Sequence, residues 1–248
     1  MERHVYDRMA EIDRDHWWFV GRRRILSALI QRFRPKPEPL RILEVGCGTG
    51  SNIAMLQQFG MVDAVEPDDH ARAFAANRTG LAIKGGYLPD VQLEDGYYDL
   101  IVLLDVLEHI PDDLGALVAL KPKLAPGGRL LLAVPAMPSL WSGHDVAHHH
   151  QRRYTVRTLE HVVRAAGFRK LHRGAFNTLL LPAIVGVRLL NRLLGRTGGD
   201  EDRIPSPPVN RLLAALFGWE RHAAVRGLFP AGVSLALVAE PVEGGSTR

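Results

Sequence analysis

Three short segments of the chain combine ligand-binding residue types with a position directly after an apolar run. The first is glycine-rich and reads Leu43-Glu44-Val45-Gly46-Cys47-Gly48-Thr49-Gly50. The second is Glu66, and the third is Asp105-Val106-Leu107-Glu108-His109. Glycines let a backbone turn tightly and approach a ligand closely, and carboxylates accept strong hydrogen bonds from it. Together the segments predict a binding site for a polar small molecule.

The spacing of these segments favours a nucleoside cofactor. Glu66 comes sixteen residues after Gly50, where a carboxylate can accept hydrogen bonds from both ribose hydroxyls of an adenosine. The glycines follow the pattern G-x-G-x-G, whereas the dinucleotide fingerprint is G-x-G-x-x-G, so a nicotinamide-dependent dehydrogenase is disfavoured. We expect Cys47 to be a small residue that fills a tight loop and not a nucleophile.

A fourth segment, residues 136–154, gathers bases and cations: His144, Asp145, His148, His149, His150, Arg152, Arg153 and Tyr154. We predict that His150, or alternatively His109, takes the proton from an acceptor hydroxyl, while the arginines orient an anionic group. A metal site built from His144, Asp145 and a later histidine is an alternative. Its spacing matches no established metal signature, so we predict no metal. A solvated polar loop is the other alternative.

Strands and helices alternate between residues 40 and 170, which indicates an α/β fold with a parallel sheet covered by helices on both faces. Apolar runs predict strands at 41–45, 62–65, 81–84, 98–104, 129–134, 169–176 and 234–240. Helical spacing and capping residues predict helices at 4–13, 22–34, 51–59, 69–77, 113–124 and 156–166. The ligand-binding segments therefore lie at the carboxyl ends of strands, where open parallel sheets bind ligands.

The motifs LEVGCGTG, VEPD and LLDVLEHI, taken together, resemble those of class I S-adenosylmethionine-dependent methyltransferases, over about residues 40–170. The resemblance implies a Rossmann-like, doubly wound, mostly parallel seven-stranded sheet whose last strand is antiparallel. It also implies S-adenosyl-L-methionine as cofactor and S-adenosyl-L-homocysteine as product. The reaction would move a methyl group to a small-molecule acceptor, most simply at an oxygen, in natural-product or lipid-linked biosynthesis.

By this resemblance, the cofactor contacts are assigned by motif. The methionine end would be lined by Glu44, Gly46, Gly48 and Gly50, with Cys47 between them, and bordered by Asp105 and Val106. Glu66 would hold the ribose, and Pro67 and Asp68 would lie near the adenine. The sequence departs from the pattern at Lys84-Gly85-Gly86-Tyr87, where many relatives place an acidic residue, so the adenine contacts there are left open.

Two flanking segments narrow the resemblance to a bacterial subgroup of small-molecule methyltransferases. They are His16-Trp17-Trp18-Phe19-Val20-Gly21-Arg22-Arg23-Arg24 and the Leu140–Tyr154 stretch with its H-D and H-x-R-R-Y elements. His150 matches the histidine of that pattern. The predicted substrate-binding residues are Trp17, Arg22, Trp141, His144, Asp145, Arg152, Arg153 and Tyr154.

Charge and length divide the chain into four parts. Residues 1–36 carry a net charge of +4, residues 37–140 carry −7, and residues 141–230 carry +8. We predict an N-terminal helical cap segment (1–36), a cofactor-binding core (40–176), a helical insertion (177–230) and a last core strand (231–241). The two basic segments would cover the carboxyl edge of the sheet and face an anionic or apolar acceptor. A dimer interface, or membrane contact through residues 178–196, are the alternatives for the insertion.

Composition excludes several other classes. A 46% hydrophobic share is too high for a disordered chain, and one cysteine excludes an internal disulfide framework. With no signal-peptide pattern and no long apolar run, we expect a cytoplasmic protein, at most peripheral to the inner membrane face. A nucleic-acid methyltransferase is an alternative because the pI is near 9.4. However, no separate RNA-binding module is visible, and we expect no nucleic-acid partner. A non-catalytic cofactor-binding subunit of a biosynthetic complex is the other alternative.

Overall fold

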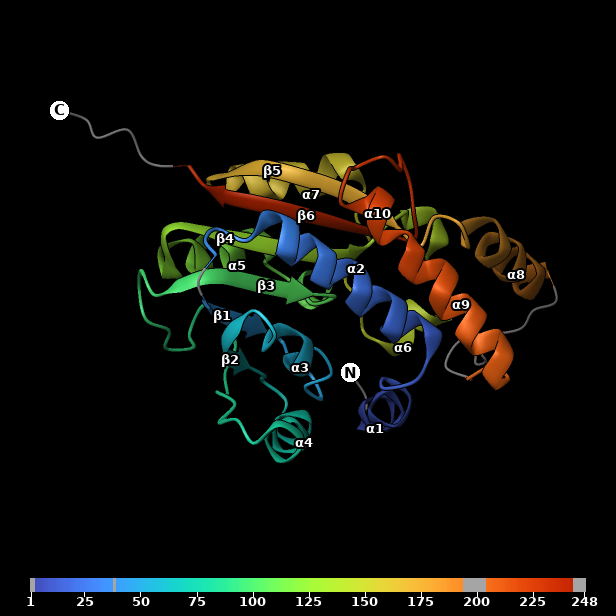
Figure 1. Cartoon of the computed structure of the whole chain (residues 1–248), viewed down its shortest axis with the longest axis horizontal. Coiled ribbons are helices and arrows are strands. Elements are labelled where there is room, and N and C mark those ends of the chain that lie inside the picture. The colour runs from blue at the N-terminus through green and yellow to red at the C-terminus, as the bar shows by residue number, and fades with distance from the viewer. Residues whose placement is uncertain (1–2, 38, 194–203, 243–248) are drawn as a thin grey trace.

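The computed structural model describes residues 3–37, 39–193 and 204–242 and has one six-stranded sheet (Figure 1). The strand order is β2-β1-β3-β4-β6-β5. Strands β1 to β4 run parallel, and β6 runs antiparallel to both β4 and β5. The bounds are β1 Leu40–Val45, β2 Gly60–Val65, β3 Tyr98–Leu104, β4 Leu124–Pro135, β5 Phe168–Phe176 and β6 Ser234–Pro241. This is the predicted doubly wound α/β sheet with an antiparallel last strand.

The prediction of seven strands is wrong, because residues 81–84 do not form a strand. Within that segment Lys84 alone pairs with the sheet, in an isolated bridge to Val65. A left-handed Gly80 ends the preceding helix, and Gly85 and Gly86 follow Lys84. Too few residues with strand propensity lie between these glycines to extend the pairing.

Helices cover both faces of the sheet. Strand residues on one face form an apolar cluster with α5 (Asp113–Leu120) and α7 (Val156–Ala165). Those on the other face form a second cluster with α2 (Trp17–Phe33), α3 (Ile53–Leu56), α4 (Asp69–Thr79), α9 (Pro207–Trp219) and α10 (Arg221–Ala224). The remaining helices are α1 (Arg3–Ile12), α6 (Gly143–Ala147) and α8 (Leu181–Leu193). The successive side chains of β3 alternate between the clusters, as expected for a strand buried on both faces.

The N-terminal segment contributes to the core. The residues Ile25, Leu26 and Leu29 of α2 are fully buried in the same cluster as β1, so this part of the helix is a layer of the core. Its apolar spacing gives it a face that the sheet buries, and the assignment of residues 1–36 to a cap stays a prediction. The region around α1 lies towards the glycine-rich loop, where Asp13 contacts Thr49 and pairs with Arg78.

The insertion packs against the first part of α2 (Figure 1). The backbone N–H of Trp17 donates to Asn210, and the Phe217 ring lies where a side chain on Gly21 would have to stand. The segment leaves the sheet at the carboxyl end of β5, where Glu220 accepts the backbone N–H groups of Thr178 and Leu179. Its role as a lid or an interface stays a prediction.

Helix α8 presents Val187 and Leu190 to solvent, each more than half exposed. Three arginines of this segment recur every four residues, Arg188, Arg192 and Arg196, but they fall outside the side chains that the structure describes. Among the described residues, no helix combines the length and the apolar character needed to cross a bilayer. Membrane contact and dimer formation through this segment stay predictions.

Candidate functional site

The glycine-rich loop lies where β1 ends, and its backbone needs glycine at the predicted positions. Gly46, Gly48 and Gly50 all have positive φ angles, between +54° and +77°. A Cβ on Gly46 would stand 2.7 Å from a methyl group of Val106, whereas one on Gly48 would meet nothing within 4 Å. Gly46 therefore lets the loops after β1 and β3 pack together, and Gly48 leaves an open approach for a ligand.

Glu66 fixes the loop and keeps room for a ligand. Its buried carboxylate accepts the backbone N–H of Gly48 at 2.7 Å and that of Asp68 at 3.0 Å. A carboxylate oxygen can accept a further hydrogen bond, so both oxygens keep acceptor capacity for ribose hydroxyls. Burial raises the pKa of Glu66, and the two N–H groups oppose that shift. Asp68, which follows Pro67, caps α4 by accepting the N–H of Ala71, so part of its carboxyl group serves the helix.

A second buried carboxylate lies beneath the loop. Glu44 accepts a hydrogen bond from Asn52, and its other oxygen has no hydrogen-bond partner among the described residues. Arg22 donates to the oxygen of Asn52 and pairs with Asp105 at 2.5 Å, so one network joins α2 to the ends of β1 and β3. Burial raises the pKa of Glu44 to about 7. Asp105 has a positive φ of 57°, which turns the chain sharply after β3.

These features fit S-adenosylmethionine. The site offers an open cradle at Gly48, free acceptor positions on Glu66 and an unpartnered oxygen on Glu44, which suits a cationic group. Cys47 is buried, and burial raises its pKa, so the thiol stays protonated and serves as a small residue in the loop. Burial raises the pKa of Tyr6 on α1, and the negative charges of Glu66 and Asp68 raise it further.

His150 is held in place by a buried aspartate. Asp145 is completely buried on α6 and accepts from Nδ1 of His150 at 2.8 Å and from Nε of Arg153 at 2.7 Å. Its second oxygen accepts the N–H of Ser142 at 2.8 Å, within a capping box. These donors lower the pKa of Asp145 despite its burial. The Nδ1 contact leaves Nε2 of His150 available for chemistry.

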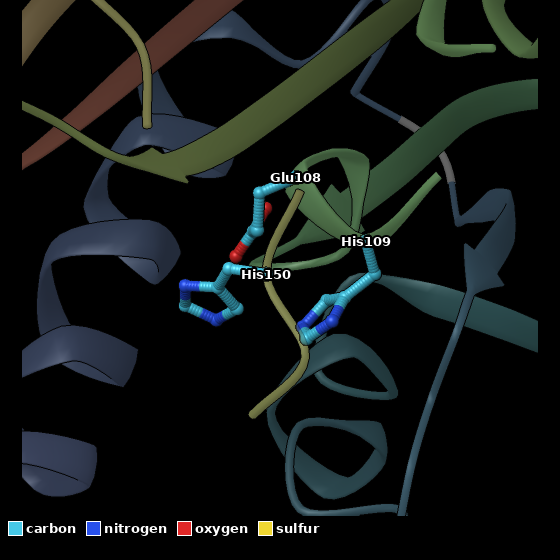
Figure 2. Close-up of side chains that lie close together, drawn as sticks. All are labelled: Glu108, His109 and His150. Atoms are coloured by element: carbon cyan, nitrogen blue, oxygen red, sulfur yellow. The ribbon is translucent and has the colours of Figure 1, made fainter. Parts of the chain in front are cut away.

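Next to His150 lie Glu108 and His109, on the short helix η1 (Leu107–His109) after β3. Figure 2 shows the carboxyl group of Glu108 pointing towards the two imidazole rings. The ring centroids of His109 and His150 are 4.7 Å apart. Burial and then the neighbouring His150 lower the pKa of His109 to about 3, so its imidazole is neutral. Burial, with Asp105 nearby, raises the pKa of Glu108 well above its usual range.

The predicted anion-orienting residues are largely bound to the protein itself. Arg153 is buried against Asp145 and also donates to the backbone oxygen of Ala136. The hydroxyl of buried Tyr154 donates to Asp113, which also pairs with Arg152. The assignment of Arg153 and Tyr154 to an acceptor site stays a prediction, and these contacts give both side chains the partners inside the fold that a buried cation or hydroxyl needs.

Of the remaining predicted residues, His144 lies near His150, with ring centroids 6.2 Å apart, whereas Trp17 lies in another contact. Trp17 packs edge-on against Phe217, in the contact between α2 and α9. Trp141 is partly exposed, and the rings of His144 and His148 lie together with centroids 4.0 Å apart. The alternative metal set is not assembled, because the oxygens of Asp145 already accept from Ser142, His150 and Arg153.

Sequence reasoning assigned no role to Glu108 or Asn52. Glu108 is a carboxylate beside two apolar residues in the segment Asp105–His109, which directly follows a buried strand, and this was a usable signal. Asn52 gives no comparable signal, since its importance depends on the distant Arg22 that it contacts.

Comparison with known proteins identifies the family. The family model described as a methyltransferase domain matches residues 19–173, more than half of the chain. Among curated proteins, a trans-aconitate 2-methyltransferase from Deinococcus radiodurans is 33% identical over 131 residues, covering 51% of this chain and 46% of its own. A ubiquinone biosynthesis O-methyltransferase from Caulobacter sp. is 32% identical over 105 residues, covering 39% and 41%. The chain thus spans less than half the length of these relatives.

Solved structures show the same fold at low identity. The methyltransferase in a complex with the Haloferax volcanii Trm112 activator superposes with a TM-score of 0.62 at 16% identity, over 97% of this chain and 96% of the other. A phosphoethanolamine N-methyltransferase from Haemonchus contortus with bound S-adenosyl-L-methionine gives 0.57 at 16% identity, over 87% and 52%.

Proposed function

Because this chain belongs to the class I S-adenosylmethionine-dependent methyltransferase family, we propose that it methylates an oxygen of a small-molecule acceptor. The observation that carries the proposal is the Asp145–His150 pair, whose Nδ1 contact of 2.8 Å leaves Nε2 of His150 to act on an acceptor. An oxygen acceptor also agrees with the name of one relative, the ubiquinone biosynthesis O-methyltransferase.

In this proposal the glycine loop and Glu66 hold the nucleoside, and Glu44 faces the methionine end. S-Adenosylmethionine, when bound, supplies an electrophilic methyl group on a sulfonium. Asp105, fixed by Arg22, borders the place where that methyl group meets the acceptor. Positioning accounts for much of the rate, since the reaction is a one-step displacement between two bound molecules.

His150 acts as the base in this scheme. The acceptor hydroxyl gives its proton to Nε2, and the electron pair left on the oxygen is free to take the methyl group. Asp145 stabilises the resulting imidazolium through Nδ1 and keeps the ring in the required tautomer. The neutral His109 is the second candidate, but its low pKa makes it the weaker base.

A methyl-transfer assay with isotopically labelled S-adenosylmethionine and a panel of hydroxylated and carboxylated small molecules tests the proposal. With a hydroxyl acceptor, His150→Ala should lower kcat about 10²-fold and leave the cofactor Kd unchanged. His161→Ala, which removes an exposed histidine on α7, is the matched control and should turn over normally. Normal turnover in His150→Ala would show that His150 is not the base. If no member of the panel is methylated, the assignment of an oxygen acceptor is contradicted.

A further inference from the structure

We propose that Glu108, His109 and His150 form a binding site for one divalent transition-metal ion, of the Zn²⁺ or Mn²⁺ kind. One ligand atom from each of the three side chains lies within 4.8 Å of the other two. Figure 2 shows the carboxyl group and both imidazole rings gathered in one place. Ligand atoms bonded at about 2.0 Å to a tetrahedral ion stand about 3.3 Å apart, so small side-chain rotations complete the site.

The buried carboxyl group of Glu108 is the independent observation in favour of a cation. Glu108 has no solvent exposure, and neither of its oxygens has a hydrogen-bond partner among the described residues. Buried polar groups are normally hydrogen-bonded, because an unpaired one loses its water without compensation. A cation between Glu108 and the two imidazoles would supply the missing interaction.

The surroundings of His150 match those of a metal ligand. A ligating histidine usually gives its other ring nitrogen to a carboxylate or a backbone carbonyl, which fixes the tautomer. Nδ1 of His150 contacts Asp145 at 2.8 Å, so its ring can present Nε2 to the ion. One ring nitrogen of His109 lies within 4.8 Å of the ligand atoms of Glu108 and His150. Two imidazoles and one carboxylate favour a transition metal over Mg²⁺ or Ca²⁺, which prefer oxygen ligands.

Three protein ligands leave at least one coordination position for an oxygen of the acceptor. This role, unlike the site itself, rests on the proposed function. The acceptor O–H bond would break on coordination, with the proton released to solvent and the electron pair kept by the oxygen. His150 would then serve as a ligand through Nε2 and not as the base, so the two schemes differ in whether transfer needs a metal.

Metal content and metal binding test the site without any acceptor. Chelator-treated protein is titrated with Zn²⁺ in a calorimeter and with Co²⁺ under visible absorption, which reports nitrogen and oxygen ligation. We expect the wild type to bind one equivalent of the metal ion. The Kd should be at least about tenfold higher in Glu108→Gln and in His150→Ala. His161→Ala should bind as the wild type, and cofactor affinity and circular dichroism verify that each variant is folded.

The outcomes separate the site from the proposed function. If the wild type binds no ion, or if Glu108→Gln binds Zn²⁺ as tightly as the wild type, the metal site is overturned. Glu108 would then be a buried neutral carboxyl group. If the ion binds but the panel of acceptors is not methylated, the proposed function fails and the site stands. If methyl transfer is unchanged after chelation, the site stands as a structural one and its role in acceptor activation is contradicted.

Discussion

The two sides of the carboxyl edge of the sheet differ in how they use their charged groups. On the glycine-loop side, Glu66 keeps free acceptor positions and Glu44 has an oxygen without a hydrogen-bond partner among the described residues. In the 136–154 loop, Asp145 and Arg153 neutralise each other inside the fold. Charges that are fully paired stabilise a structure, whereas buried polar groups with unused capacity are available to a ligand. The difference indicates that the glycine-loop side is available to the cofactor, whereas the Asp145–Arg153 pair holds the 136–154 loop and its His150 in place.

The largest expected effect tests the structural assignment of the 136–154 loop. Arg153→Ala leaves Asp145 as a buried charge without its guanidinium, so the free energy of unfolding should fall by about 3–5 kcal/mol. Arg152→Ala is the matched change one residue away, in a pair that is partly exposed, and should cost less than about 1 kcal/mol. Urea denaturation measures both. Equal losses of unfolding free energy in the two variants would contradict the prediction that Arg153 stabilises the fold more than Arg152 does.

The next effect concerns Glu44, which has one oxygen without a hydrogen-bond partner among the described residues. Its pKa of about 7 in the folded state lies above the ordinary 4.5, so the folded state holds a proton that the unfolded state releases first. The stability from this proton is complete below pH 4.5 and is lost as the pH rises through 7, by up to about 3 kcal/mol. Urea midpoints at several pH values should show this slope.

Glu44→Gln is the control for that slope. The amide oxygen keeps the hydrogen bond from Asn52, but the side chain no longer titrates, so the variant should lack this part of the pH dependence. A slope that persists unchanged in Glu44→Gln would assign the titration to another group.

The smallest of the three effects is on ligand affinity. Glu66→Ala removes the predicted ribose acceptor and one anchor of the glycine loop, so S-adenosylmethionine should bind at least about tenfold more weakly, or about 1.4 kcal/mol. Asp69→Ala removes an acid of α4 that is 90% exposed and controls for the change in net charge. Calorimetry compares them. Unchanged affinity in Glu66→Ala would show that this side does not hold the nucleoside.

The glycine-loop side could be predicted from sequence because its signals are local. Positive φ angles at Gly46, Gly48 and Gly50 demand glycine, and Glu66 directly follows an apolar strand. The sheet, its strand bounds to within a few residues and the antiparallel β6 were also predictable, since they follow from apolar runs and the family pattern. The prediction of a strand at residues 81–84 was wrong because four residues between glycines pair with the sheet only at Lys84. Apolar content alone does not determine such pairing.

The partners of the 136–154 loop could not be predicted from sequence. Arg152 and Tyr154 find Asp113, forty residues earlier on α5, and nothing near either residue indicates that contact. Likewise the proximity of Glu108 to His150 depends on two loops that meet only in the folded chain. The residue types indicated that the 136–154 loop carries bases and cations. Tertiary contacts decide which of these side chains can still contact a ligand.

The position of β6 between two other strands has a consequence for the order of folding during synthesis. β6 lies between β4 and β5, yet 57 residues separate the end of β5 from its start. At about 5–20 residues per second, a ribosome needs roughly 3–12 s to reach β6 after finishing β5. During that interval β5 has no neighbour in the sheet, and the edge of β4 is open. The nascent chain therefore exposes two unpaired strand edges that a chaperone would have to shield until β6 joins them.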